Sequence, residues 1–353
     1  MIQVLCVAFN DLKPGMKVAK DVQLDDGRLL LLSGFIINQR YLNRLEAFSI
    51  PYVYIQEEEV KSEDKKEEEV YTEASGTIKS AMTSLREGKE INSEVLKETV
   101  NDIISHVITN ETVFSKLAGI RDIDNYTYLH SIDVCIYSLM AGKFLGLKED
   151  ELLELGTSAA LHDIGKSKVP MEVLMKPGKL TPEEFDQMKL HPVYSKEIIS
   201  NMKGFSKRIA DVSSQHHEKW DGSGYPKGIK GKDIDYYARI ISVADVYDAI
   251  TADRVYKKRE MPHKAADFIL KNRQTQFDAD VAEIFINNMT FYHQGSIVLL
   301  SSGEVGYVME TVTGLLTRPK INIFASKGGP PLIKPYVLEL SEEEDVEVVD
   351  ILS

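Results

Sequence analysis

The sequence has few cysteines, a single tryptophan and no long apolar run. Its 353 residues include two cysteines, Cys6 and Cys135. Two thiols exclude a disulfide framework, and such low usage is typical of a reducing compartment. The first residues, MIQVLCVAFNDLKPG, lack the basic segment of a signal peptide. No uncharged apolar run approaches the roughly 20 residues of a membrane span. The sequence therefore predicts a cytoplasmic protein without a membrane span.

Positive charge is also in short supply. The chain carries 42 Lys and Arg residues against 55 Asp and Glu residues, a formal net charge of -13. This balance argues against a general surface for nucleic acid or for anionic membranes. An anionic substrate would therefore need local positive charge, from metal ions or from individually placed Lys and Arg side chains. The length and the 43% hydrophobic content are sufficient for two or three domains with a sizeable core.

The hydrophobic pattern changes along the chain and predicts an α+β multidomain protein whose central domain is all-α. The predicted parts are a small N-terminal α+β accessory or regulatory domain over 1–56, an acidic linker over 57–73, a helical domain over 74–292 and a C-terminal β appendage over 293–353. The 57–73 segment has many charges and few apolar residues, which is typical of a solvated linker or an exposed helix start.

Turn signals and β-type runs predict the elements of the two ends. The N-terminal elements are a hairpin over 16–32 that turns at Asp26-Gly27, a short helix over 38–48 and a strand over 51–55. The predicted C-terminal strands cover 296–300, 305–311, 320–324 and 336–340. The N-terminal part contains no phosphate-cradling glycine loop.

From Ala74 onwards, apolar residues recur at spacings compatible with 3.6, which predicts successive helices. Gly88 is expected to separate the first two helices. Their apolar stripe, between residues 78 and 108, is expected to cover a core or a dimer partner. His106 lies within this stripe and is interpreted as a packed or surface residue, not as a metal ligand. A buried helix over 124–146 then carries His130.

The next helix, over 149–160, runs into the pair His162-Asp163, and Gly165 is expected to end it. Adjacent residues on a helix point about 100° apart, but an imidazole and a carboxylate can still converge on a metal beside the helix end. The Asp163 carboxylate has two oxygens, so it can bridge two metals. Lys166 follows as a cation placed to meet phosphate oxygens. The alternative interpretation is a capped helix end with solvated charges.

Histidines gather in the same region of the chain. Five of the eight fall in these helical motifs, namely His130, His162, His191, His216 and His217. Neutral imidazoles and carboxylates are the usual protein ligands of transition metals, so a metal cluster is the first hypothesis. Asp245 lies in the apolar helix ARIISVADVYDAITADRVY, where a buried carboxylate is costly unless it is paired or metal-bound. The alternative for His216-His217 is an exposed polar turn.

A glycine-rich loop, KWDGSGYPKGIKG, covers Lys219–Gly231 directly after the histidine pair. Its four glycines allow backbone conformations that other residues avoid. Trp220 and Tyr225 present flat faces that could stack on a purine. The alternative is a mobile surface loop whose rings cap the core.

The motifs HDIGK, HHEKWDGSGYP and ARIISVADVYDAITADRVY, with NYTYLHS upstream, resemble the HD-GYP subgroup of the HD-domain phosphohydrolases. The resemblance covers roughly residues 122–277, and these long, ordered motifs are far more specific than a lone His-Asp pair. It implies an all-α catalytic domain that hydrolyses cyclic di-GMP through a non-haem metal centre, with Gly224-Tyr225-Pro226 as the GYP signature.

The resemblance also implies roles for individual residues. The implied metal ligands are His130, His162, Asp163, His191, His216, His217 and Asp245. The implied catalytic residues are Asp163, which bridges the metals, with Lys166 and Arg254. The implied substrate contacts are Lys166, Tyr225, Arg254 and Lys257, and Asp248 resembles an acid that orients a ligand. Tyr126 stands where some members hold a third metal with Glu, so we expect two divalent ions, Fe or Mn.

The function implied is hydrolysis of cyclic di-GMP to linear pGpG, to GMP, or to both. Two alternatives stay open, an HD-type phosphohydrolase that acts on another cyclic or non-cyclic nucleotide and a non-catalytic sensor of cyclic di-GMP. Two partners are also open hypotheses, a second copy of the chain bound through the N-terminal helices and a diguanylate cyclase or other signalling protein bound at the GYP loop. No nucleic-acid partner is expected.

Overall fold

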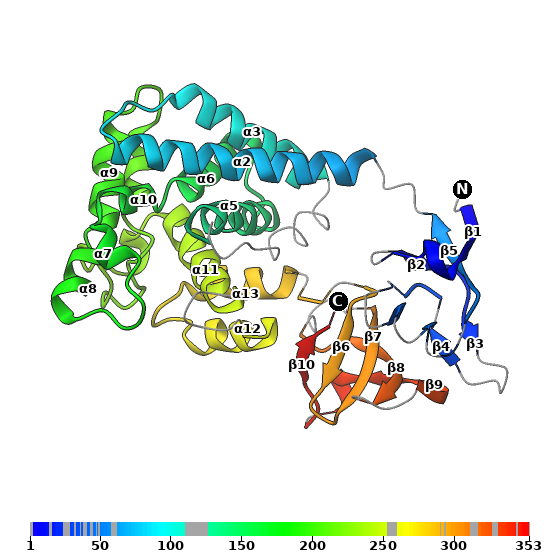
Figure 1. Cartoon of the computed structure of the whole chain (residues 1–353). Helices are drawn as coiled ribbons and strands as arrows, with labels where there is room; N and C mark the ends of the chain where they lie inside the picture. Colours follow the sequence, from blue (N-terminus) through cyan, green and yellow to red (C-terminus); the bar gives the residue numbers. More distant parts are fainter. Residues whose placement is uncertain are drawn as a thin grey trace. The chain divides into compact units, whose positions relative to one another are not determined.

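The computed structural model of the chain forms two compact units by its internal contacts (Figure 1). The helical unit covers Lys66–Thr290, and the flanking unit combines Met1–Lys65 with Phe291–Ser353. The structure describes residues 3–13, 16–23, 29–31, 33–35, 37, 41–42, 45–46, 48, 50–57, 62–109, 126–252, 260–289, 291–292, 294–310, 317–326, 331–343 and 345–352. The two ends of the chain, which local sequence pattern suggests as separate parts, therefore share one unit.

The predicted all-α character of the central part is confirmed. Its described α-helices are α2 (Ser62–Arg86), α3 (Ser93–Thr109), α5 (Tyr126–Phe144), α6 (Glu149–Ala160), α7 (Met171–Leu174), α8 (Pro182–Met188), α9 (His191–Asn201), α10 (Lys207–Ser213), α11 (Tyr236–Thr251), α12 (Pro262–Lys271) and α13 (Ala279–Asn288). Two short 3-10 helices, η3 (Ile164–Lys168) and η4 (Gly231–Asp233), lie in the connections. As far as the structure describes them, the motifs singled out in the sequence lie on or between α5 and α11, and Ala252 directly follows α11.

Helix α5 is central to the packing of the helical unit. It packs against α6 and α11, and every side chain from 129 to 142 is buried. A helix that is mostly apolar on all sides belongs in the interior of a protein. The helix ends before Gly146, whose φ of 77° is a left-handed conformation that glycine adopts without strain. The buried helix predicted over 124–146 is thus confirmed from residue 126.

The long helix α2 begins inside the segment predicted as an acidic linker over 57–73. This segment is helical from Ser62 because Glu and Lys are good helix formers and because buried Tyr71 and Ala74 begin the apolar side of α2. The Tyr71 hydroxyl also donates to Asp133 on α5, at 2.7 Å. Gly88, with φ 70°, separates α2 from α3 as predicted.

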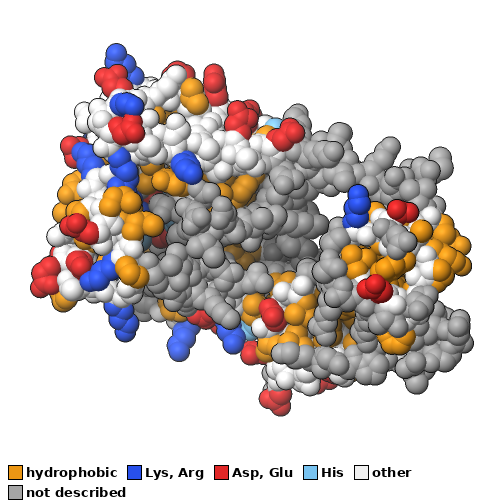
Figure 2. All heavy atoms as spheres, in the orientation of Figure 1, with side chains coloured by type: hydrophobic (Ala, Val, Ile, Leu, Met, Phe, Trp, Pro, Cys, Tyr) orange, Lys and Arg blue, Asp and Glu red, His pale blue; other side chains and the backbone are white. Residues whose placement is uncertain are grey.

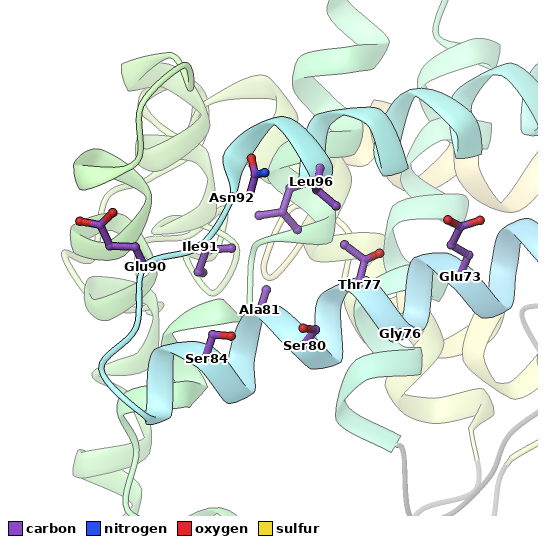
Figure 3. Close-up of a pocket in the computed structure, with 11 residues that line it drawn as sticks. Glu73, Gly76, Thr77, Ser80, Ala81, Ser84, Glu90, Ile91, Asn92 and Leu96 are labelled. Atoms are coloured by element: carbon purple, nitrogen blue, oxygen red, sulfur yellow. The ribbon is translucent and has the colours of Figure 1, made fainter.

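A groove of about 410 Å³ lies between α2 and α3 (Figure 3). Small side chains on α2 form one wall, and the start of α3 with Leu96 forms the other. On the face of the helical unit that Figure 2 shows, Lys and Arg side chains lie among Asp and Glu side chains and do not gather in one patch. Among the described helices, none is long and apolar enough to cross a membrane.

The flanking unit is built from antiparallel strands. A three-stranded sheet has the order β1-β5-β2, with β1 (Gln3–Ala8), β2 (Lys17–Val18) and β5 (Tyr52–Glu57). The short strands β3 (Val22–Gln23) and β4 (Leu29–Leu31) pair with each other. A five-stranded sheet has the order β10-β6-β7-β8-β9, with β6 (Ile297–Leu300), β7 (Glu304–Glu310), β8 (Lys320–Ser326), β9 (Pro331–Glu339) and β10 (Val348–Ile351).

One hydrophobic cluster joins the two ends of the chain within this unit. It includes Leu12 and Val53 with Ile297, and the rings of Phe35 and Phe324 lie 6.0 Å apart in an edge-to-face arrangement. The predicted strand over 51–55 and the four predicted C-terminal strands are confirmed. The short strand β10 was not predicted, and it pairs with β6, far upstream in the sequence. The turn predicted at Asp26-Gly27 lies outside the described residues, as does most of the helix predicted over 38–48.

Candidate metal centre

Five separate segments bring histidine and aspartate side chains to one buried place. They are α5 with His130, the turn after α6 with His162 and Asp163, the start of α9 with His191, the turn after α10 with His216 and His217, and α11 with Asp245 and Asp248. Three groups of these side chains have ligand atoms within 4.8 Å of one another. The groups are His191 with His216 and His217, His130 with His162 and Asp245, and His162 with Asp163 and His216.

The Asp163 carboxylate lies between the histidines. Its Oδ1 is 3.2 Å from Nε2 of His191 and 3.9 Å from Nε2 of His216. Its Oδ2 is 3.3 Å from Nε2 of His162 and 3.6 Å from Nε2 of His130. The two oxygens of one carboxylate therefore face two different sets of imidazoles.

Three of these imidazoles are oriented in the same way, by a carbonyl three residues earlier. The Nδ1–H of each ring donates to a carbonyl in the last turn of the preceding helix. The pairs are His162 with Ala159 at 2.6 Å, His191 with Met188 at 2.7 Å, and His216 with Ser213 at 2.6 Å. Such carbonyls lack the full set of partners inside the helix. Because Nδ1 carries the proton, each Nε2 keeps a lone pair directed at the site.

His130 is oriented by a carboxylate. Its Nδ1 lies 2.5 Å from Oδ2 of Asp248, which is fully buried, and its Nε2 lies 3.2 Å from Oδ1 of Asp245. A carboxylate on the far nitrogen fixes the orientation of the ring and makes the near nitrogen a better ligand. The orienting role expected of Asp248 stays a prediction. His106, by contrast, bonds to the carbonyl of Asp102 within its own helix at 2.7 Å.

Two buried atoms at the centre have no hydrogen-bond partner among the residues that the structure describes. Nε2 of His162 and Oδ1 of Asp163 are buried, and the described part of the chain offers them no partner of hydrogen-bond geometry. A buried polar atom without a partner costs roughly 1–3 kcal/mol. A divalent cation among these donors would satisfy both atoms, and imidazole and carboxylate ligands suit such an ion. The residues therefore fit a metal centre.

Burial keeps several of the imidazoles neutral. It lowers the pKa of His130 to about 4 and that of His217 to about 3. Burial, together with neighbouring imidazoles, also holds the pKa of His216 well below its usual value. Metal ions bind the neutral imidazole, so at neutral pH these three rings need not lose a proton to accept a metal.

The carboxylates at the centre are held in the ionised form. Burial alone would raise the pKa of Asp163, but the Lys166 ammonium and the His162 imidazole hold it well below its usual value. Burial likewise opposes the shift at Asp245, where the bond to His130 and nearby imidazoles lower the pKa. Burial acts to lower the pKa of His162, but the Asp163 carboxylate raises it. Ionised carboxylates and mostly neutral imidazoles form a donor set that attracts cations.

Lys166 lies on η3, and its ammonium forms an ion pair with Oδ2 of Asp163. The carbonyl of Lys166 accepts a hydrogen bond from Nη2 of Arg86, at 3.0 Å, so the end of α2 holds this turn from outside. No motif in the sequence singles out Arg86. Arg86 lies 80 residues upstream of Lys166. Its position in the last turn of a helix, which is common for a basic residue, is the one local feature it shows.

Ser195 joins the His162-Asp163 turn to α9. Its Oγ donates to the carbonyl of His162 at 2.7 Å and accepts from the N–H of Gly165 at 2.9 Å. The expectation that Gly165 ends the preceding helix is wrong, because α6 already ends at Ala160 and Gly165 lies inside η3. Gly165 permits close packing, since a Cβ there would lie 2.0 Å from the backbone oxygen of His191.

The glycine-rich loop lies beside the histidine pair. The Tyr225 ring lies 4.8 Å from the His217 ring with an interplanar angle of 33°, and the Tyr225 N–H donates to the His217 carbonyl at 3.1 Å. Burial raises the pKa of the Tyr225 hydroxyl, so it stays protonated. Arg254 and Lys257, predicted to contact phosphate, lie outside the described residues, as does His293. Tyr126 is the first residue of α5.

Comparison with known proteins identifies the family and the fold of the helical unit. The family described as HD domain matches residues 94–281, more than half of the chain. A solved structure of an HDG"Y"P protein from Bdellovibrio bacteriovorus aligns with a TM-score of 0.54 at 18% identity, over 80% of this chain and 98% of that one. At this identity the alignment shows a shared fold.

Curated relatives are phosphodiesterases of cyclic dinucleotides by name. A cyclic di-GMP phosphodiesterase of Pseudomonas aeruginosa is 34% identical over 269 residues, 76% of this chain and 64% of that protein. A 3'3'-cGAMP-specific phosphodiesterase of Vibrio cholerae is 35% identical over 169 residues, 48% of this chain and 36% of that protein. The chain thus spans less than two thirds of the length of these relatives.

Replacing Gly165 tests the tight packing at the His162-Asp163 turn. Gly165→Ala places a Cβ against backbone atoms of His191 and Ser195 that no side-chain rotation can move away. We expect it to lower the free energy of unfolding by about 1–3 kcal/mol and to lower the metal content. Thermal unfolding and elemental analysis measure both effects. Gly76→Ala is the control, because its Cβ on α2 meets no atom within 4 Å. Wild-type stability and metal content in Gly165→Ala would contradict the packing described.

Proposed function

Because the chain belongs to the HD-domain family, we propose that it is a metal-dependent phosphodiesterase that hydrolyses cyclic di-GMP. The observation that carries the proposal is the buried Asp163 carboxylate, whose two oxygens face different sets of imidazoles. That arrangement suits a carboxylate shared by two metal ions. The names of similar proteins in Pseudomonas aeruginosa and Xanthomonas campestris, both cyclic di-GMP phosphodiesterases, support the substrate.

Two divalent ions, iron or manganese, are proposed for this donor set. His191, His216 and His217 would hold one ion, His162 and Asp245 the other, with Asp163 shared and His130 at or next to the metals. A set rich in imidazole and free of thiolate favours these ions over a cysteine-bound zinc. When bound, two such ions supply positive charge for phosphoryl oxygens and acidify water.

The side chains around the centre would bind and orient the substrate. The Lys166 side chain is 21% exposed, so a phosphate can approach the ammonium that now lies on Asp163. By resemblance, Arg254 and Lys257 join it as phosphate contacts. Fixed cations of this kind stabilise charge that develops on a phosphoryl group without having to reorganise. The Tyr225 ring, next to His217, is proposed to shape the pocket for a base of the substrate.

A second candidate substrate comes from the relatives. Two of the similar proteins in Vibrio cholerae are named 3'3'-cGAMP-specific phosphodiesterases, at 35% and 32% identity. This similarity favours hydrolysis of a mixed cyclic dinucleotide as the alternative. A non-catalytic sensor fits less well, because the implied metal ligands are all present and gathered. The homodimer and the signalling partner at the GYP loop stay predictions.

The first test is turnover by the full chain reconstituted with iron or manganese. Cyclic di-GMP and 3'3'-cGAMP are supplied in parallel, and the products are separated to distinguish pGpG from GMP. We expect hydrolysis of cyclic di-GMP with the larger kcat/KM. Preferential cleavage of 3'3'-cGAMP would replace the substrate but keep the reaction. Absence of turnover in protein with about two metals per chain would overturn the proposed activity.

The bridging role of Asp163 is tested by Asp163→Asn, which keeps the volume and removes the charge shared between the two ligand sets. We expect loss of turnover and a metal content well below two ions per chain, with unchanged helix content by circular dichroism. The matched control is Asp233→Asn, at an exposed position, which should keep both metals and the activity. Two metals and the original rate in Asp163→Asn would show that the bridging assignment is wrong.

Lys166→Ala separates phosphate binding from metal binding. If the ammonium stabilises charge on the phosphoryl group, kcat should fall by about 10²–10³-fold while both metals are retained. Steady-state kinetics and elemental analysis on the same preparation measure the two quantities. Lys168→Ala is the control, because Lys168 lies two residues away on η3 and pairs with Glu197 at 3.0 Å. An unchanged kcat in Lys166→Ala would exclude Lys166 from the reaction.

A further inference from the structure

Glu218 is a buried acid that the proposed chemistry does not use. It follows His217 directly, and it is 2% exposed. Its Oε1 accepts a hydrogen bond from the backbone N–H of Lys227 at 2.7 Å. Its Oε2 is buried, and the described part of the chain provides no hydrogen-bond partner for it. Burying a carboxyl group costs free energy unless the group is hydrogen-bonded. We therefore asked what the bond to Lys227 contributes to the structure.

Lys227 belongs to the tip of the glycine-rich loop, which we define as Gly224–Lys227. The tip lies directly on the backbone that carries the histidine pair. The Tyr225 N–H donates to the His217 carbonyl at 3.1 Å. A Cβ at Gly224 would lie 2.5 Å from that same oxygen and from Cα of Glu218, so glycine is required for this approach. The tip is thus attached at two points. Tyr225 is held by a main-chain bond to His217, and Lys227 is held by the side chain of Glu218.

The base of the loop is held by other groups. The N–H of Trp220 donates to the Gln276 carbonyl at 3.1 Å, and the N–H of Asp221 donates to the Thr275 carbonyl at 2.8 Å. These bonds do not involve Glu218. Among the described residues, Glu218 is the side chain from outside the loop that bonds to its tip. Loss of the Glu218 bond should therefore loosen the tip and leave the base in place.

The space around Glu218 is too small for a ligand of its own. It lines a cavity of about 10 Å³ together with Trp220, Arg239 and Ser242. A cavity of this size holds about one water molecule. Arg239 also bonds to Asp278 at 2.7 Å, so its charge is already compensated. The cavity can supply a water for the second carboxylate oxygen, but it cannot admit a nucleotide or a phosphate.

We propose that Glu218 is a positioning residue, which fixes the loop tip so that the Tyr225 ring keeps its place beside His217. This inference rests on the proposed function, because it concerns how the same site receives its substrate. The buried hydrogen bond that Oε1 of Glu218 accepts from the Lys227 N–H holds the tip in one conformation. Without it, binding of the substrate must order the tip, and that cost appears in KM.

Two substitutions at Glu218 test the length of the side chain and its carboxylate group separately. Glu218→Gln keeps an oxygen at the same distance and removes the charge, whereas Glu218→Asp keeps the charge and is one methylene shorter. We expect Glu218→Asp to raise KM for cyclic di-GMP by about 10-fold, the loss of one buried hydrogen bond, with kcat and metal content within about 2-fold. Glu218→Gln should stay near the wild-type KM. Both variants are compared at equal metal loading.

A second readout does not depend on turnover. Trp220 is the one tryptophan of the chain and lines the cavity beside Glu218. We expect Glu218→Asp to change the emission of Trp220 and its quenching by acrylamide, and Glu218→Gln to change neither. Glu98→Ala, at an exposed position on α3, is the control for removal of a surface carboxylate.

The outcomes decide between separate possibilities. Wild-type KM and emission in Glu218→Asp, or equal losses in both variants, would overturn the positioning role. Loss of metal in Glu218→Gln would make the residue part of the metal centre and also overturn it. If the wild-type chain does not hydrolyse cyclic di-GMP, the proposed function fails by itself, and the emission of Trp220 still decides whether Glu218 anchors the loop tip.

Discussion

The burial of one negative charge, the carboxylate of Asp163, is the constraint on which the candidate site depends. A buried carboxylate is stable only where cations or donors surround it closely. Here one oxygen faces His191 and His216, and the other faces His162, His130 and the Lys166 ammonium. The atoms at the centre that keep no hydrogen-bond partner among the described residues belong to the same His-Asp pair. The protein part of the site is therefore complementary to added positive charge, which is why a metal centre follows from its electrostatics.

The helices supply more than support for this centre. His162, His191 and His216 each follow a helix end, and each ring donates its Nδ1–H to a carbonyl of the last helical turn. Free carbonyls at helix ends have to be satisfied in any fold. In this chain they also select the tautomer that leaves each Nε2 open to the centre. The same hydrogen bonds thus cap three helices and prepare three ligands, so a change at a helix end would alter stability and metal binding together.

The buried centre and the loop beside it are held in place by different contacts. The buried centre is built by α5, α6, α9, α10 and α11, whose packing fixes the ligands. The loop with Tyr225 stands next to it and is held by its own bonds to Glu218 and to the turn before α13.

By itself the sequence determined the helical class of the central unit and four of the C-terminal strands, and it predicted the candidate site residues, because these rest on local periodicity and on motifs of fixed spacing. Thr181, for example, precedes Pro182 and stands three residues before Glu184, which is the local pattern of a helix start, and the structure shows its reciprocal bonds with Glu184. Only the tertiary structure decided which groups meet. Contacts such as that of Arg86 with Lys166, 80 residues apart, leave no local pattern. The same holds for the role of Gly165 in close packing, for Ser195 between two segments, and for the shared core of the two chain ends. Periodicity reports which face of an element is buried, but the partner that buries it is chosen by packing over the whole chain.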